Sequence, residues 1–137
     1  MKTWLIDTGP LVALLVGDDT QHVWSVEQSR HAPATVLTCE AVVSEALFLL
    51  KRDGHDTDDL FTLVDTGFLR TDFDFHDEYR QVRDLMHRYR ERPMSFADAC
   101  LVRMAELRAD ASVWTLDRDF QFYRKHRRQT LSLVTPW

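Results

Sequence analysis

Short apolar segments alternate along this chain with longer segments whose apolar residues recur at helical spacing. The short segments predict strands at residues 2–6, 36–38, 68–71, 111–115 and 131–134. The longer segments predict helices at 11–16, 21–29, 40–52, 58–65, 76–90, 95–107 and 120–126. Strands separated by helices favour a parallel sheet with both faces covered. We therefore expect an α/β fold with a three-layer α/β/α architecture and a central parallel sheet of four to five strands.

The size and composition predict one domain. The chain has 137 residues, and 45% of them are hydrophobic, which is enough for one sizeable core. Only four Gly and four Pro occur, so no flexible linker divides residues 1–137. The net charge of -5 means that any binding of nucleic acid must depend on local basic patches.

The N-terminal segment and the cysteines predict a cytoplasmic protein. The first apolar run is broken by Asp7, Gly9 and Pro10, so it does not resemble a signal peptide, and no apolar stretch is long enough to span a membrane. Cys39 and Cys100 are far apart in the sequence, and neither belongs to a Cys-x-x-Cys pair. We interpret them as free thiols in a reducing compartment.

Acidic residues follow the predicted strands. Asp7 comes directly after the first strand, Asp117 and Asp119 come after the strand at 111–115, and Asp98 lies in the first turn of the helix that Ser95 begins. Ligands of such sheets bind outside the carboxyl ends of the strands. These acids are therefore expected on one edge of the sheet.

Each of these acids also has a purely structural explanation. Asp7 could cap the helix that follows it. Ser95 and Asp98 have the spacing of a capping box, with Asp in place of Glu. Asp117 and Asp119 could be turn residues.

Glu45 is harder to explain by local structure alone. It lies in an apolar stretch of the helix at 40–52, where a carboxylate is costly unless it faces water, a partner or a metal. The helical wheel does not distinguish Glu45 from Glu40, because both fall on the margins of the apolar face. Several carboxylates in one pocket would raise one another's pKa values, and a hard divalent cation with oxygen ligands, Mg²⁺ or Mn²⁺, resolves that repulsion.

Four segments together resemble the motifs of the PIN domain family, and in particular its single-domain VapC-type toxins. No one segment is specific alone, but they occur in the expected order and spacing over nearly the whole chain. The segments are Leu5-Ile6-Asp7-Thr8-Gly9-Pro10-Leu11-Val12-Ala13-Leu14, Ser44-Glu45-Ala46-Leu47-Phe48-Leu49-Leu50, Met94-Ser95-Phe96-Ala97-Asp98-Ala99 and Trp114-Thr115-Leu116-Asp117-Arg118-Asp119-Phe120.

The resemblance implies the site and the activity. It selects Glu45 over Glu40 and Asp117 as the fourth acid, so the catalytic set is Asp7, Glu45, Asp98 and Asp117. We expect Asp7 and Asp98 to be the principal ligands for Mg²⁺ or Mn²⁺. Thr8, Thr115 and Asp119 are expected to be supporting residues, and Asp119 is close enough in sequence to share or replace the role of Asp117. The implied activity is endoribonuclease cleavage of RNA.

The resemblance also implies partners, namely a homodimer and a small antitoxin protein, as in a type II toxin–antitoxin pair. Two basic runs, 124–128 and Arg88 with Arg90 and Arg92, are candidates for positioning RNA phosphates. A solvated charged face is the alternative interpretation of the second run. Phe122, Tyr123 and Tyr89 could stack bases, although core packing is the simpler role for them.

Three other functions are compatible with parts of the sequence. One is an RNA-processing PIN nuclease that is not a toxin, and another is a degenerate PIN scaffold that binds RNA or protein without cutting it. The third follows from Asp7-Thr8-Gly9, which also resembles the active-site triplet of aspartic proteases. Those proteases are rich in β-structure, whereas this chain is mostly helical, so we reject that interpretation.

Overall fold

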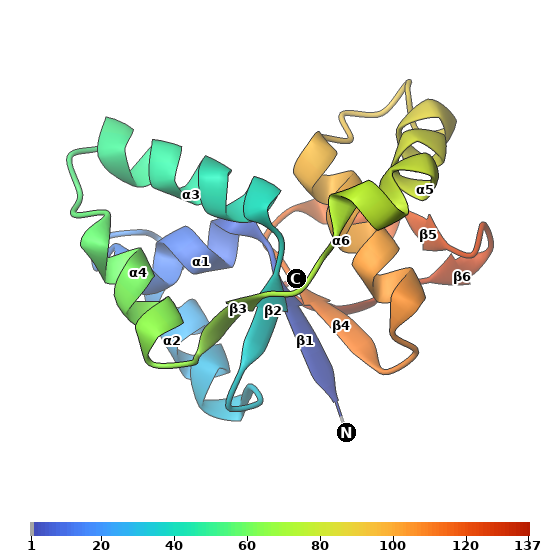
Figure 1. The fold of residues 1–137 in the computed structure, drawn as a ribbon. Helices are drawn as coiled ribbons and strands as arrows, with labels where there is room; N and C mark the ends of the chain where they lie inside the picture. The colour runs from blue at the N-terminus through green and yellow to red at the C-terminus, as the bar shows by residue number, and fades with distance from the viewer. Residues whose placement is uncertain (1) are drawn as a thin grey trace.

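The computed structural model describes residues 2–137 and has three layers, with a sheet between two groups of helices (Figure 1). The central sheet has five strands, all parallel, in the order β3-β2-β1-β4-β7. The strands are β1 (Thr3–Ile6), β2 (Val36–Thr38), β3 (Leu69–Thr71), β4 (Ala111–Trp114) and β7 (Ser132–Val134). This confirms the predicted α/β architecture. Met1, the first residue of the predicted domain, lies outside the described residues.

The helices divide between the two faces of the sheet, as Figure 1 shows. The chain runs from β1 to β2 to β3 in one direction and then returns past β1 to β4. Because crossovers between parallel strands are right-handed, this reversal places the earlier and later helices on opposite faces. The first group is α1 (Thr8–Leu15), α2 (His22–His31), α3 (Glu40–Arg52) and α4 (Asp58–Asp65), and the second is α5 (Phe75–Arg88) and α6 (Phe96–Leu107).

The core is centred on β1 and β4, which are neighbours in the sheet. Leu5, Ile6, Val113 and Trp114 are fully buried, as expected for strands covered on both faces. Ile6 pairs with Trp114, so the two strands reach their carboxyl ends at the same level. The residues that follow each strand are therefore brought together. Within residues 2–137, no helix is long and apolar enough to cross a membrane.

The helix predicted at 120–126 is wrong. The chain instead forms a short 3₁₀ helix, η1 (Arg118–Gln121), and an antiparallel hairpin of β5 (Arg124–Lys125) and β6 (Gln129–Thr130). Phe120 and Tyr123 are buried in the core and hold this segment there. Their spacing in the sequence is also compatible with a helix, so a short apolar run does not reveal which structure forms. The structure also starts α1 at Thr8, three residues before the predicted start at residue 11.

Candidate functional site

A cavity of about 410 Å³ opens where β1 and β4 end, at the point where the strand order reverses. Ten residues line it, and four of them are the acids Asp7, Glu45, Asp98 and Asp117. They come from four separate segments: the ends of β1 and β4, the middle of α3, and the first turn of α6. The fold thus brings together all four acids of the predicted catalytic set.

Asp7 is both the cap of α1 and a wall of the cavity. Its Oδ1 accepts a hydrogen bond from the Thr8 backbone N–H at 2.8 Å, and its Oδ2 accepts one from the Thr115 hydroxyl at 2.7 Å. Burial raises the pKa of Asp7 to about 7; these two hydrogen bonds oppose the shift, and the charges of Asp98 and Asp117 add to it. The capping interpretation and the site interpretation are therefore compatible.

The two threonines connect the acids. The Thr8 hydroxyl donates to Glu45 Oε2 at 3.2 Å, which joins α1 to α3. The Thr115 hydroxyl donates to Asp7 and accepts a hydrogen bond from the Asp117 backbone N–H at 2.9 Å. Both threonine hydroxyls therefore contact an acid that lines the cavity.

Glu45 lines the cavity, whereas Glu40 at the beginning of α3 does not. The helical wheel had left the two equivalent. What separates them is the contact between α3 and α1, which turns Glu45 toward the Thr8 hydroxyl. This distinction depends on tertiary packing.

Asp98 forms the capping box that its spacing from Ser95 predicts. The Asp98 N–H donates to Ser95 Oγ at 3.0 Å, and Asp98 Oδ2 accepts from the Ser95 N–H at 3.1 Å. Burial raises the pKa of Asp98, and the nearby charge of Asp117 adds to the shift.

Sequence reasoning missed one neighbour of this site, Tyr123. Its ring is fully buried, and its hydroxyl donates to Asp98 Oδ2 at 3.3 Å. Burial and the charge of Asp98 raise the pKa of Tyr123, so the phenol remains a donor. A tyrosine 25 residues from Asp98 carries no signal in the sequence that links it to this carboxylate. Its burial also excludes it from stacking on RNA bases.

The fourth corner of the cavity is formed by Asp117. Its Oδ1 accepts a hydrogen bond from the Asp119 N–H at 2.9 Å, and this bond caps η1 at its N-terminus. Asp119 itself is not among the residues that line the cavity. The geometry thus places Asp119 beside the site and Asp117 in it.

The donor set fits a hydrated divalent cation. Asp98 Oδ1, Asp117 Oδ2 and Glu45 Oε1 accept no hydrogen bond from any group within residues 2–137. In the same part of the chain, no three His, Cys, Asp or Glu side chains lie close enough to enclose a metal ion unaided. Mg²⁺ characteristically keeps several waters and uses one or two carboxylates, so an open arrangement of oxygens suits it.

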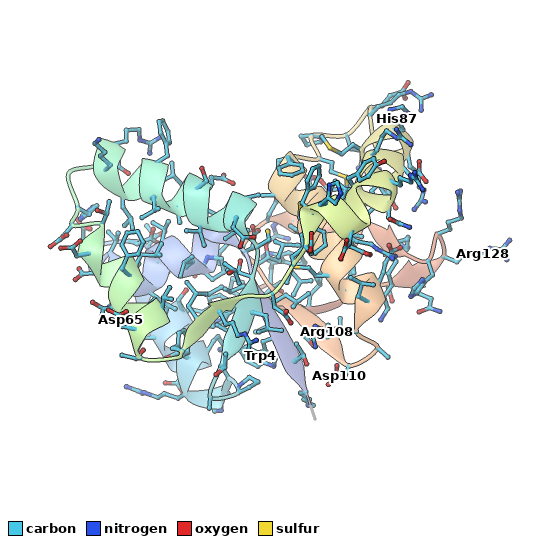
Figure 2. All side chains as sticks on the ribbon, viewed as in Figure 1. Trp4, Asp65, His87, Arg108, Asp110 and Arg128 are labelled. Atoms are coloured by element: carbon cyan, nitrogen blue, oxygen red, sulfur yellow. The ribbon has the colours of Figure 1, made fainter. Side chains whose placement is uncertain are left out.

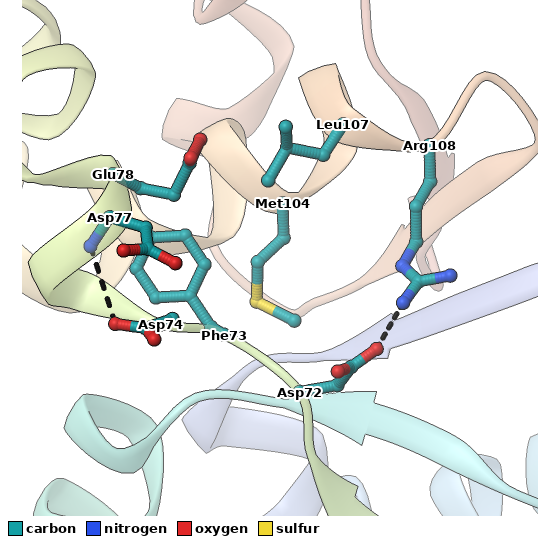
Figure 3. Close-up of a pocket in the computed structure, with 8 residues that line it drawn as sticks. All are labelled: Asp72, Phe73, Asp74, Asp77, Glu78, Met104, Leu107 and Arg108. Atoms are coloured by element: carbon teal, nitrogen blue, oxygen red, sulfur yellow. Dashed lines mark hydrogen bonds and ion pairs between the residues drawn. The ribbon is translucent and has the colours of Figure 1, made fainter.

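A second acidic cavity, of about 370 Å³, lies beside α5 and α6 (Figure 3). Three of its four carboxylates have partners within the fold: Asp72 pairs with Arg108, Asp74 Oδ1 caps α5 by accepting the Asp77 N–H at 3.3 Å, and Glu78 pairs with Arg103. These acids stabilise local structure, and none of them was predicted as a site residue.

The fold and the site together define a class: a three-layer α/β protein with an acidic cavity at the switch point of its parallel sheet. The sequence profile of the PIN domain family matches residues 4–126, and the chain belongs to this family. A search of curated proteins found no match.

Among solved structures, the chain is similar to VapC20 of Mycobacterium tuberculosis, described as a toxin that cleaves the Sarcin-Ricin loop. The two structures superpose with a TM-score of 0.80 at 21% sequence identity, over 93% of this chain and 99% of VapC20. At this identity the match establishes a shared fold.

Proposed function

We propose that residues 1–137 form a single nuclease domain, a metal-dependent endoribonuclease that hydrolyses phosphodiester bonds of RNA. The observation that carries the proposal is the cavity in which Asp7, Glu45, Asp98 and Asp117 converge from four segments. Membership of the PIN domain family supports the same conclusion.

Asp7 and Asp98 would hold Mg²⁺ or Mn²⁺, directly or through water. When bound, the cation supplies a coordinated water of lowered pKa and stabilises charge on the phosphate. Glu45 and Asp117 orient waters through their free oxygens, and Thr8 and Thr115 fix the positions of the carboxylates. Asp119 has a supporting role beside Asp117.

The deciding experiment is RNA cleavage with Mn²⁺ or Mg²⁺, comparing the unmodified protein with Asp7→Asn and Asp98→Asn. We expect both variants to lose cleavage, and we expect EDTA to abolish it in the unmodified protein. Asp65→Asn is the matched control, because Asp65 is an exposed acid at the end of α4 (Figure 2) and does not line the cavity. Equal activity of all proteins, or activity that survives EDTA, would refute the proposal.

We further propose that the protein acts as the toxin of a type II toxin–antitoxin pair, because its fold is that of VapC20. The processing nuclease and the non-catalytic scaffold are the alternatives. Expression that halts bacterial growth only while Asp7 and Asp98 are intact would distinguish the toxin from both. A cytoplasmic location is supported by Cys39 and Cys100, which are both buried free thiols.

The proposed homodimer and antitoxin contact need an apolar surface. Large apolar side chains are exposed on the helices of the first group, with Val23, Phe48, Phe61 and Val64 between 46% and 80% exposed. Exposed large apolar side chains are candidates for contact with another protein. Light scattering of the purified protein, alone and with Phe48→Ser, measures whether this surface holds two copies together.

A further inference from the structure

The two arginine-rich segments of the sequence lie side by side in the fold. A cavity of about 370 Å³ separates the C-terminal half of α5 from the β5–β6 hairpin, and its lining includes Arg88, Arg103 and Arg127. The Arg124 N–H donates to the Tyr89 hydroxyl at 2.9 Å. The contact thus joins residues about 35 positions apart into one surface.

A second contact joins the two segments closer to the active-site cavity. The guanidinium of Arg92 lies 4.2 Å from the ring centroid of Phe122, whose side chain is 44% exposed. We call the seven cations of these segments the basic face: Arg88, Arg90, Arg92, Arg124, Lys125, Arg127 and Arg128.

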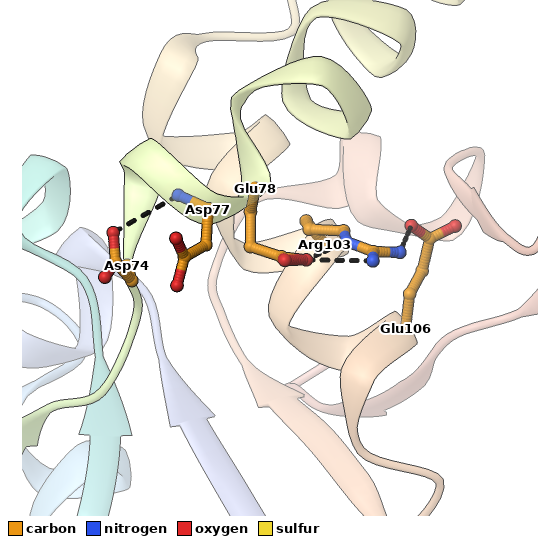
Figure 4. Close-up of polar contacts among 5 residues, drawn as sticks. All are labelled: Asp74, Asp77, Glu78, Arg103 and Glu106. Carbon is orange, nitrogen blue, oxygen red and sulfur yellow. Dashed lines mark hydrogen bonds and ion pairs between the residues drawn. The ribbon is translucent and has the colours of Figure 1, made fainter.

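The basic face is not neutralised by the protein. Within residues 2–137, none of its seven cations has a carboxylate oxygen within 4.0 Å. The nearby acids Glu78 and Glu106 are both paired with Arg103, at 2.8 and 3.2 Å (Figure 4). Asp84 is the other acid that lines the cavity, and Glu91 stands between Arg90 and Arg92 in the sequence without an ion pair among the described residues.

Arg88 carries an unsatisfied donor. Its Nη1 is buried and has no hydrogen-bond partner among the described residues. Leaving a buried N–H without a partner is destabilising, and more so when the group is charged. An anionic oxygen entering the cavity beside Arg88 would satisfy it.

The hairpin holds its cations in a costly conformation. His126 and Arg127 have positive φ angles of 49° and 70°, a region that bulky residues rarely adopt. Glu106 stabilises the turn, because its Oε2 accepts the His126 N–H at 2.7 Å. Strained backbone of this kind concentrates at binding sites. Here it presents Arg127 and Arg128 to solvent.

Charge is also segregated over the whole molecule. Residues 1–65 contain 11 acids and 4 bases, whereas residues 66–137 contain 11 acids and 13 bases. Figure 2 shows Asp65 and Arg128 on opposite sides of the molecule, with His87 of α5 on the side of Arg128. A protein with a net charge of -5 therefore keeps one side available to an anion.

The basic face leads to the acidic cavity. Arg92 precedes Pro93, which lines that cavity, and Tyr123 connects the hairpin to Asp98 through its hydroxyl. We propose that the basic face binds the sugar–phosphate backbone of single-stranded RNA and leads the strand to the acidic cavity. This inference rests on the proposed ribonuclease function and names the surface that the substrate uses.

RNA fits the basic face better than an acidic protein does. Guanidinium groups form two parallel hydrogen bonds with phosphate and with carboxylate alike, so charge alone does not choose between RNA and an acidic protein. The exposed ring of Phe122 beneath Arg92 adds a surface on which a base can stack. Backbone contacts of this type position a nucleic acid without reading its sequence.

The test is the salt dependence of RNA binding, measured in EDTA so that no cleavage occurs. A short fluorescently labelled single-stranded RNA is titrated with protein over a range of KCl concentrations, and anisotropy gives the affinity. For single strands, each phosphate contact contributes about 0.7 to the slope of log affinity against log salt. We expect Arg127→Gln with Arg128→Gln to reduce that slope by about 1.4, and Arg88→Gln to reduce it by about 0.7.

Two matched variants separate charge from structure. Lys51→Gln with Arg70→Gln removes the same charge from exposed positions away from the basic face, and we expect its slope to be unchanged. Arg127→Lys with Arg128→Lys retains the charge, so we expect it to retain the slope. Because Arg127 and Arg128 are exposed, the variant with Arg127→Gln and Arg128→Gln tests the proposal even if Arg88→Gln fails to fold.

An unchanged slope in the Arg127→Gln, Arg128→Gln protein would overturn the proposal. The proposal would also be overturned if polyglutamate displaced the labelled RNA as effectively as unlabelled RNA of equal charge does. The basic face would then bind an acidic polypeptide equally well. The ribonuclease proposal is tested separately. If the unmodified protein cleaves RNA but the Arg127→Gln, Arg128→Gln variant has an unchanged slope, only the proposal about the basic face is refuted. If the slopes change as expected but the unmodified protein does not cleave RNA, only the ribonuclease proposal is refuted.

Discussion

Asp7 shows how a single buried carboxylate links stability to function. Its folded-state pKa of about 7 lies well above its ordinary value of 3.8, because burial penalises the charged form. A raised carboxyl pKa favours the folded state while the group is protonated. That contribution is fully present below pH 3.8 and is lost as the pH rises through 7.

We therefore expect the metal-free protein to lose stability relative to Asp7→Asn as the pH is raised from 4 to 8. Each pKa unit corresponds to about 1.4 kcal/mol, so the relative change is on the order of a few kcal/mol. Urea unfolding in EDTA at several pH values measures it. A difference between the two proteins that does not vary with pH would contradict this account.

Gly9 controls how closely α1 approaches the segment after β4. A Cβ at this position would lie 3.2 Å from Leu116 Cδ1 and 3.3 Å from Leu116 Cβ, which is tighter than ordinary contact. Asp117 follows directly, so a shift of Leu116 displaces the fourth acid. We expect Gly9→Ala to reduce metal-dependent RNA cleavage by roughly 10-fold, since small misplacements of catalytic groups are costly.

The control for this substitution is Gly17→Ala. No atom lies within 4 Å of a Cβ built at Gly17, and we expect normal cleavage there. Parallel rate measurements with circular dichroism separate a displaced acid from a misfolded chain. If Gly9→Ala and Gly17→Ala cleave equally well, the close contact with Leu116 has no functional role.

At the level of elements, helix N-termini provide three of the four acids: Asp7 caps α1, Asp98 lies in the first turn of α6, and Asp117 caps η1. Ser95 and Asp98 satisfy each other's backbone N–H at the start of α6. We expect Ser95→Ala to lower the free energy of unfolding by about 1 kcal/mol. Thr57 is the matched control, because it caps α4 without a side-chain hydrogen bond. Thr57→Ala should therefore change stability by less, and chemical denaturation of both variants tests this order.

The hairpin is the element whose structure the sequence pattern mispredicted. Phe120 and Tyr123 have apolar spacing compatible with a helix, yet tertiary contacts bury both rings and pair β5 with β6. Their burial brings the Tyr123 hydroxyl to Asp98 and the cations that follow Tyr123 to the end of α5. Local periodicity does not encode contacts of this range, and a short element has little else to indicate its type.

At the scale of the whole molecule, the four acids repel one another, although the fold holds their four segments together. A divalent cation that binds only the folded protein relieves this repulsion and stabilises the protein by mass action, about 2.7 kcal/mol at a concentration 100 times the Kd. We expect Mn²⁺ to raise the Tm of the unmodified protein. Asp7→Asn and Asp98→Asn should lose most of that increase, whereas Asp65→Asn should keep it. Equal increases in all four proteins would place the ion elsewhere.

Patterns along the chain were enough to predict the parallel sheet, its alternation with helices outside residues 118–130, and the caps at Asp7 and Ser95. These features depend on apolar periodicity and on hydrogen bonds between residues a few positions apart. The family resemblance already selected Glu45 over Glu40, but only tertiary packing shows why, because α3 packs on α1 and brings Glu45 to the Thr8 hydroxyl. Only packing brings the Tyr123 hydroxyl to Asp98 and the two arginine-rich segments to one face. These contacts are long-range in the sequence. Side chains far apart in the chain meet only where packing of the sheet and its helices brings them together.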